Sequence, residues 1–145
     1  MDNGSFPSAV TAEDFPPKLF YFSHIEPSDK TPEDEKFEKL TALMKKERLF
    51  TDCNIKRNEI ALKIGLSDRG LHDCLKNNIG MSFMEYINHL RLTYVRELIA
   101  SAGGKLTIEA IATISGFHSR ITFWRLFQEK YSLTPEEFKK ISGKT

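Results

Sequence analysis

The sequence has few cysteines and no long apolar run. Its 145 residues include only Cys53 and Cys74, which are too few for a disulfide framework. Cys74 falls on an apolar helical face, so we expect a reduced, buried thiol and a cytoplasmic protein. No apolar run reaches the roughly 18 residues that a membrane-spanning helix needs. The first residues lack a basic stretch followed by an apolar one, so we expect no secretory signal.

The sequence also lacks the residue groupings that metal binding and catalysis require. Its four His and two Cys show no paired ligand spacing, so we expect no metal site. The sequence shows neither a nucleophile with a matching base nor a Gly-rich loop for holding phosphates. We therefore expect no cofactor and no enzymatic activity.

The composition that remains is that of a globular protein with an uneven charge distribution. Hydrophobic residues make up 40% of the chain and charged residues 28%. Residues 1–50 carry seven Lys and Arg against ten Asp and Glu, a net charge of −3. Residues 51–145 carry fourteen against ten, a net charge of +4. This basic excess is compatible with nucleic-acid binding but does not by itself indicate it.

The first 30 residues differ in pattern from the rest of the chain. They hold four of the six Pro, which favours an extended and partly disordered N-terminal arm. The apolar stretch 19–22 is the one part of this arm that could dock on the body. Residues 31–145 have a helical pattern almost throughout and no convincing strand, so we predict one all-α domain there.

Capping sequences mark three helix starts. Thr31 precedes a Pro and three acidic residues, and Ser82 and Thr134 are each followed by Glu three positions later. Apolar residues then follow Ser82 at spacings of three and four, which predicts one long amphipathic helix over about residues 83–100. The residues of this predicted stripe are Phe83, Ile87, Leu90, Tyr94 and Leu98.

One pattern of small and apolar residues occurs twice. The residues that recur are Ile60, Ala61 and Gly65 with Ile111, Ala112 and Gly116, 51 positions apart, and Ser67, Leu71 and Leu75 with Ser119, Phe123 and Phe127, 52 positions apart. The second copy therefore has one additional residue in the turn that follows its Gly.

Each copy has the pattern of a helix-turn-helix unit. A small Ala lets two helices cross closely, and a Gly suits a sharp turn with positive φ. A Ser then caps a second helix, which buries its fourth and eighth residues after the cap and leaves its opposite face polar. We predict these units at about residues 54–78 and 107–131, joined by the long helix.

The repeat and its flanking residues resemble the AraC/XylS family of bacterial transcription regulators over about residues 37–142. The residues that carry the resemblance are Ile60, Ala61, Gly65, Ser67, Gly80, Met81, Ser82, Phe83, Tyr86, Ile87, Arg91, Ile108, Ile111, Ala112, Ser115, Gly116, Phe117, Ser119, Phe123, Phe127 and the stretch 133–138.

The resemblance implies an all-α fold of about seven helices, in which a long central helix joins two helix-turn-helix subdomains. It implies sequence-specific binding of double-stranded DNA in successive major grooves, about one DNA turn apart, to regulate transcription. It favours activation, with RNA polymerase as a further partner. Many family members also carry an upstream sensor domain, which we expect to be absent from this chain.

We expect the polar faces of the two second helices to contact DNA. The candidate residues are Arg69, His72, Asp73 and Lys76 in the first copy, and Ser119, Arg120, Thr122 and Arg125 in the second. Arginine suits guanine edges and phosphates, lysine suits phosphates, and threonine can offer a methyl or hydroxyl group to a base. His72 could instead only cap a neighbour or face water.

Three residues depart from the family pattern. Asp73 stands where an Arg is frequent, and its carboxylate repels phosphate, although it can accept a hydrogen bond from cytosine. Lys56 occupies the cap position that Thr107 holds in the second copy. Ser132 replaces a frequent Gly, which suggests a strained turn. Asp73 and the small net charge motivate an alternative hypothesis: a helical protein-interaction module that has lost DNA binding.

Overall fold

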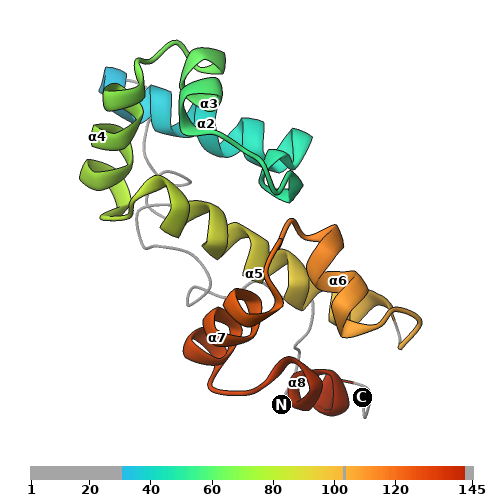
Figure 1. Cartoon of the computed structure of the whole chain (residues 1–145). Coiled ribbons are helices and arrows are strands. Elements are labelled where there is room, and N and C mark those ends of the chain that lie inside the picture. The colour runs from blue at the N-terminus through green and yellow to red at the C-terminus, as the bar shows by residue number, and fades with distance from the viewer. Residues whose placement is uncertain (1–30, 103, 143–145) are drawn as a thin grey trace. The chain divides into compact units, whose positions relative to one another are not determined.

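The fold is all-α, as the sequence predicts. The computed structural model describes residues 31–102 and 104–142, and these contain seven α-helices and no strand (Figure 1). The helices are α2 (Pro32–Glu47), α3 (Arg57–Lys63), α4 (Asp68–Ile79), α5 (Phe83–Ala102), α6 (Ile108–Ile114), α7 (Arg120–Tyr131) and α8 (Pro135–Ser142), with a short 3-10 helix, η3 (Leu49–Thr51), after α2. The expected N-terminal arm, residues 1–30, lies outside the described residues.

The described residues divide into two units. The N-terminal unit contains α2, α3, α4 and the start of α5 up to Ile87, and the C-terminal unit contains the rest of α5 together with α6, α7, α8 and residues 51–53. Each unit holds one helix-turn-helix pair, α3–α4 or α6–α7. The predicted arrangement of two such subdomains joined by a long helix is therefore confirmed.

The capping sequences act as predicted. Thr31 Oγ1 accepts a hydrogen bond from the Asp34 N–H, and the Asp34 carboxylate accepts one from the Thr31 N–H. Ser82 and Thr134 form the same reciprocal pairs with the Glu three residues later. The hydrogen bond from the Ser82 N–H lowers the pKa of Glu85, because it stabilises the charged carboxylate.

The core of the N-terminal unit comes from all of its helices. Its fully buried side chains include Phe37, Leu40, Leu71, Leu75 and Ile87. Lys36 of α2 adds a polar tie, because its ammonium group donates a hydrogen bond of 3.1 Å to the carbonyl oxygen of Ile64, just after α3. This bond holds α2 against the turn between α3 and α4.

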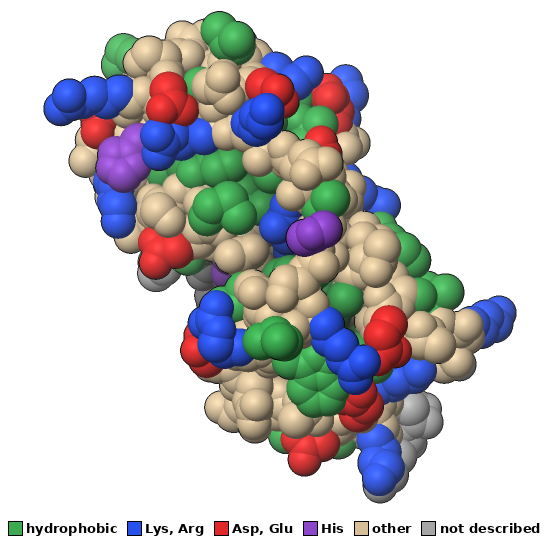
Figure 2. Space-filling view, in the orientation of Figure 1, with side chains coloured by type: hydrophobic (Ala, Val, Ile, Leu, Met, Phe, Trp, Pro, Cys, Tyr) green, Lys and Arg blue, Asp and Glu red, His purple; other side chains and the backbone are tan. Residues whose placement is uncertain are grey.

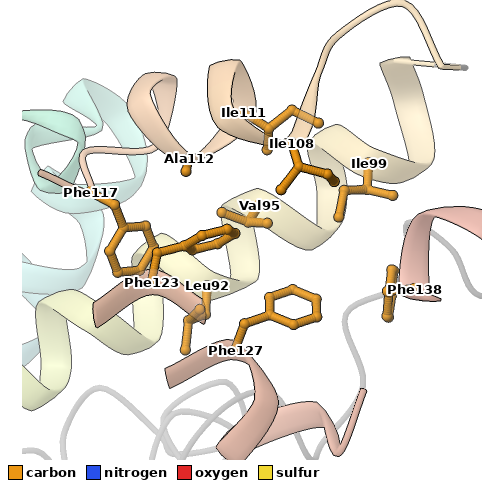
Figure 3. Packing of buried hydrophobic residues seen from close by; sticks show 10 residues of the cluster. All are labelled: Leu92, Val95, Ile99, Ile108, Ile111, Ala112, Phe117, Phe123, Phe127 and Phe138. Atoms are coloured by element: carbon orange, nitrogen blue, oxygen red, sulfur yellow. The ribbon is translucent and has the colours of Figure 1, made fainter. Parts of the chain in front are cut away.

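Four phenylalanine rings and six aliphatic side chains build the core of the C-terminal unit (Figure 3). Its buried residues are Leu92, Val95, Ile99, Ile108, Ile111, Ala112, Phe117, Phe123, Phe127 and Phe138. The Phe127 ring centroid lies 5.9 Å from that of Phe123 and 5.6 Å from that of Phe138, in a nearly perpendicular arrangement with the latter. The edge-to-face contact between Phe127 and Phe138 joins α7 to α8, and the burial of Phe123 and Phe127 shows which face of α7 is buried.

The long helix α5 is confirmed, but the single apolar stripe predicted for it is wrong. Phe83 and Ile87 are buried, whereas Leu90, Tyr94 and Leu98 are only partly buried. The buried apolar residues in the second part of the helix are Leu92, Val95 and Ile99. The stripe fails because α5 contributes to two cores, and each core buries a different face of the helix.

Candidate nucleic-acid interface

The two helix-turn-helix turns have the same backbone arrangement at their glycines, although the second turn is one residue longer. Gly65 has φ +77° and Gly116 has φ +102°, values that L side chains rarely adopt, so both turns depend on glycine. The next residue closes each turn: the Leu66 N–H donates to the Ala61 carbonyl at 2.9 Å, and the Phe117 N–H donates to the Ala112 carbonyl at 3.0 Å. The internal repeat is therefore a structural repeat of the turn.

Equivalent serines begin the second helix of each pair, which we call the recognition helices, α4 and α7. Ser67 Oγ accepts a hydrogen bond from the Gly70 N–H at 2.9 Å, and Ser119 Oγ accepts one from the Thr122 N–H at 3.2 Å. Both helices have 12 residues. The residues that follow the two caps can therefore be compared position by position.

Two of the departures noted in the sequence have structural consequences. Thr107 caps α6 through a hydrogen bond from the Ala110 N–H, whereas Lys56 makes no side-chain cap for α3. Ser132 adopts φ +60° at the end of α7, a left-handed conformation that strains a non-glycine residue. The strained turn suggested for Ser132 is therefore present.

The exposed face of α4 carries charges of both signs. Arg69, Asp73 and Lys76 are exposed, while Leu71 and Leu75 on the opposite face are buried. The Arg69 Nε lies 3.9 Å from the Asp73 carboxylate, one helical turn along. Asp73 therefore partly neutralises the arginine that we expect to approach DNA.

His72 occupies an edge of this face rather than its centre. Its side chain is half-buried, and its Nδ1 atom is shielded from solvent without a hydrogen-bond partner. The His72 side chain can therefore contact a ligand only through the exposed part of its imidazole ring. DNA contact by His72 stays a prediction, as it does for the other candidate residues.

The exposed face of α7 begins with an arginine and is more basic than that of α4. Arg120 and Arg125 are exposed, Ser119 is exposed at the cap, and Thr122 is half-buried beside them. The Arg125 guanidinium lies 3.3 Å from the Glu129 carboxylate, and that of Arg120 lies 3.3 Å from Glu109 of α6.

On the face shown in Figure 2, basic and acidic side chains are interspersed rather than gathered into one basic patch. The Arg120 guanidinium also lies over the ring of the half-buried Trp124, 5.9 Å from its centroid. This contact and the ion pairs hold the arginines in defined positions. Each would have to exchange its acidic partner for a DNA phosphate on binding.

Ile121, which is not among the residues predicted from the sequence, also lies on this exposed face. Its side chain is 81% exposed, and it lies one helical turn before Arg125. The repeat contained the signal that could have found it: Ile121 and Arg69 are each the second residue after a capping serine.

Arg91 of α5 has a structural role. It is buried, donates a hydrogen bond of 3.0 Å to the Asp52 carbonyl, and lies over the Phe117 ring. Burial lowers the pKa of Arg91, because it disfavours the charged form. Arg91 thus ties residue 52 to the core of the C-terminal unit.

Comparison with known proteins settles the family. Residues 60–141, more than half of the chain, match the family described as a helix-turn-helix domain. The chain belongs to the AraC/XylS family. Its relatives in this family are DNA-binding transcription regulators, and the match covers α3 from Ile60 onward together with α4, α6 and α7. In the described part of this AraC-type chain, no helix is long and apolar enough to cross a membrane, and no group of three or more His, Cys, Asp or Glu could hold a metal ion.

Several curated relatives are similar to this AraC-type chain over part of their length. The transcriptional regulator GlxA of Rhizobium meliloti is 28% identical over 104 residues, which cover 72% of this chain and 32% of GlxA. The transcriptional activator RhaS of Yersinia pestis is 32% identical over 81 residues, which cover 56% of this chain and 29% of RhaS. The chain thus spans about a third of the length of the curated relatives it matches.

Two solved structures share the fold. The C-terminal domain of the two-component response regulator yesN from Fusobacterium nucleatum superposes with a TM-score of 0.62 at 24% identity, covering 72% of this chain and 98% of that domain. A protein from Listeria innocua superposes with a TM-score of 0.58 at 21% identity, covering 72% and 93%. At these identities the likeness shows the fold alone.

Proposed function

We propose that this AraC-type chain binds specific double-stranded DNA sequences through both helix-turn-helix units and thereby regulates transcription. The observation that carries the proposal is the equivalence of α4 and α7. Each is a serine-capped helix of 12 residues that follows a glycine turn, with one apolar face buried and the opposite face exposed and charged. Helices presented in this way fit the major groove.

Each recognition helix would enter its own stretch of major groove. Two units that read successive grooves about one helical turn apart would together cover roughly 15–20 base pairs. The arginines would contact guanine edges or phosphates, Lys76 would contact phosphate, and Thr122 would contact a base. The internal repeat and the family membership of the chain support this arrangement.

The two units would contribute unequally to affinity. Asp73 and Arg125 are both the sixth residue after a capping serine, and both are exposed. An arginine at this position can donate two hydrogen bonds or neutralise a phosphate, whereas an aspartate repels phosphate. We therefore assign the larger part of the binding free energy to the C-terminal unit.

We further propose that the outcome of binding is activation, with RNA polymerase as the partner and the cytoplasm as the location. The similarity to RhaS, which is named a transcriptional activator, supports this direction. The greater length of the relatives leaves room for a sensor domain outside the matched region, so no sensing role is proposed for the described helices.

Selection of duplexes from a random pool tests the proposed function. The chain should enrich a defined motif, and footprinting should show protection of about 15–20 base pairs in two parts. An Arg125→Ala variant should lose the preference at one or two positions of one part only. Failure to enrich any motif would favour the alternative function, a helical protein-interaction module. The ion pairs that Arg69, Arg120 and Arg125 form with acidic side chains are also compatible with that function.

A further inference from the structure

Ile121 is the most exposed large hydrophobic side chain among the described residues. It is 81% exposed and is the second residue after the Ser119 cap, in the first turn of α7. A β-branched side chain in an exposed helix position lowers helix propensity, and at this exposure it gains little from packing. In the free protein, Ile121 therefore slightly lowers the stability of the helix, and packing does not compensate for this loss.

The position of Ile121 on α7 places it on the proposed DNA-binding face. Residues four positions apart lie on the same side of a helix, so Ile121 lies beside Arg125. The buried residues Phe123 and Phe127 lie on the other side. A surface that packs closely against this side of α7 would therefore contact Ile121 as well as Arg125.

The first unit has a different residue at this position. Arg69 is the second residue after Ser67, and its side chain is 90% exposed. The two recognition helices thus present a group with several hydrogen-bond donors in one copy and a purely apolar group in the other. This difference suits two half-sites of different base composition.

Thymine presents the apolar group of the major groove, its C5 methyl, and apolar side chains contact it there. We propose that Ile121 contacts the C5 methyl group of a thymine and makes the C-terminal unit selective for thymine at one position. This proposal rests on the proposed function, because it requires α7 to enter the major groove. At the equivalent position, Arg69 would favour guanine.

The geometry of the helix fixes where that thymine should lie. Four residues advance an α-helix by about 6 Å, and stacked base pairs are about 3.4 Å apart. The thymine should therefore lie within about two base pairs of the base whose preference depends on Arg125. This places it in the half-site of the C-terminal unit.

Deoxyuridine provides the direct test, because it differs from thymidine only by the missing C5 methyl group. Each thymine of the selected duplex is replaced in turn by deoxyuridine, and the dissociation constant is measured for the whole chain. One replacement, near the Arg125-dependent base, should weaken binding about 3- to 5-fold, on the order expected for one buried methyl group. The Ile121→Ala variant should bind both duplexes equally.

Three variants control the measurement. Ile121→Val keeps a branched apolar group and should keep part of the difference between the duplexes. Ile141→Ala removes the same side chain from an exposed position on α8. It should leave the full difference in dissociation constant between the thymidine and deoxyuridine duplexes. Because Ile121 is so exposed and Ala has the higher helix propensity, Ile121→Ala should unfold at the same temperature as the unsubstituted chain or slightly above it.

Two results would overturn the proposal while leaving the proposed function in place. One is specific binding in which no thymine of the Arg125 half-site responds to deoxyuridine. The other is a response that persists in Ile121→Ala. If no duplex is selected at all, the proposed function fails first, and the assignment of Ile121 fails with it.

Discussion

Arg57 and Asp68 form a two-point ion pair that ties the first residue of α3 to the first residue of α4. The Arg57 Nη2 and Nε donate to the two carboxylate oxygens of Asp68 at 2.6 and 2.8 Å. Hydrogen bonding to Arg57 lowers the pKa of Asp68, which therefore stays charged. The second unit has a similar link with the signs exchanged, since Arg120 begins α7 and pairs with Glu109 in the first turn of α6.

The reversed polarity bears on DNA binding, because the residue at the start of a recognition helix would face phosphate. Glu109 holds Arg120 and offsets its charge. We predict that Glu109→Gln strengthens non-specific duplex binding on the order of 2- to 5-fold at low salt, as one nearby repulsive charge is removed. Fluorescence anisotropy with a random-sequence duplex measures this change.

Glu136→Gln is the matched control, because it removes the same charge from an exposed position in the first turn of α8. Its effect on duplex affinity should be much smaller than that of Glu109→Gln. Equal effects would mean that net charge alone governs binding and that Arg120 has no particular place in it.

The contrast between Arg125 and Asp73 gives a second prediction. Arg125→Ala should cost about 1–3 kcal/mol of specific binding, the range for one good base contact. Asp73→Arg should instead strengthen non-specific binding and steepen its salt dependence, because a repulsive charge becomes an attractive one. Titrations on the selected duplex and on a random duplex, each at two salt concentrations, separate the two effects.

Other outcomes at these two positions would be equally informative. Weaker specific binding by Asp73→Arg, with a relaxed preference at one cytosine, would identify Asp73 as a base reader. If neither substitution changes binding at either salt concentration, the recognition helices do not face DNA, and the interaction-module hypothesis should replace ours.

Most of the fold could be predicted from the sequence because its signals are local. The capping pairs at Ser82 and Thr134 and the glycines at positive φ each depend on a few neighbouring residues, and the 51- and 52-residue repeat shows one such local pattern twice. Local rules of this kind hold whatever the rest of the chain does. The all-α class and the two helix-turn-helix pairs followed from them.

The features that escaped sequence reasoning depend on packing between distant segments. The buried face of α5 changes along the helix because two cores use it, and no periodicity count within the helix shows where the change falls. The Arg120–Glu109 pair joins residues eleven positions apart, which only the turn between α6 and α7 brings together.

A third prediction concerns the core of the C-terminal unit. Phe127 is fully buried and its ring contacts those of Phe123, Tyr131 and Phe138. Phe127→Ala should reduce the free energy of unfolding by about 3–5 kcal/mol, since it removes these contacts and leaves a cavity. Urea denaturation measures this loss. The control variant Ile141→Ala should change the free energy of unfolding little. Unaltered unfolding of Phe127→Ala would show that the face assigned to α7 is wrong.

The two cysteines should differ in reactivity. Cys53 is exposed, whereas Cys74 is buried, and burial raises the pKa of its thiol to about 11. With an aromatic disulfide reagent at about pH 8, one thiol should react in the native protein and the second only after unfolding. Cys53→Ser should abolish the fast reaction, and rapid reaction of both thiols in the unsubstituted chain would contradict the burial of Cys74.

The same shift predicts a pH effect on stability. The folded state holds the Cys74 proton more tightly than the ordinary thiol pKa of 9.0 allows in the unfolded chain. The resulting stabilisation is complete below pH 9 and is lost as the pH rises toward about 11. Cys74→Ala should show a smaller decline between the two pH values, because it removes the contribution of this thiol.

The salt dependence of binding to the best selected duplex tests the central claim most directly. Two recognition helices in successive major grooves should neutralise about six phosphates, so log K should fall with log salt with a slope of about −5. A slope near zero on that duplex would contradict DNA binding by these helices, whatever the sequence of the selected site.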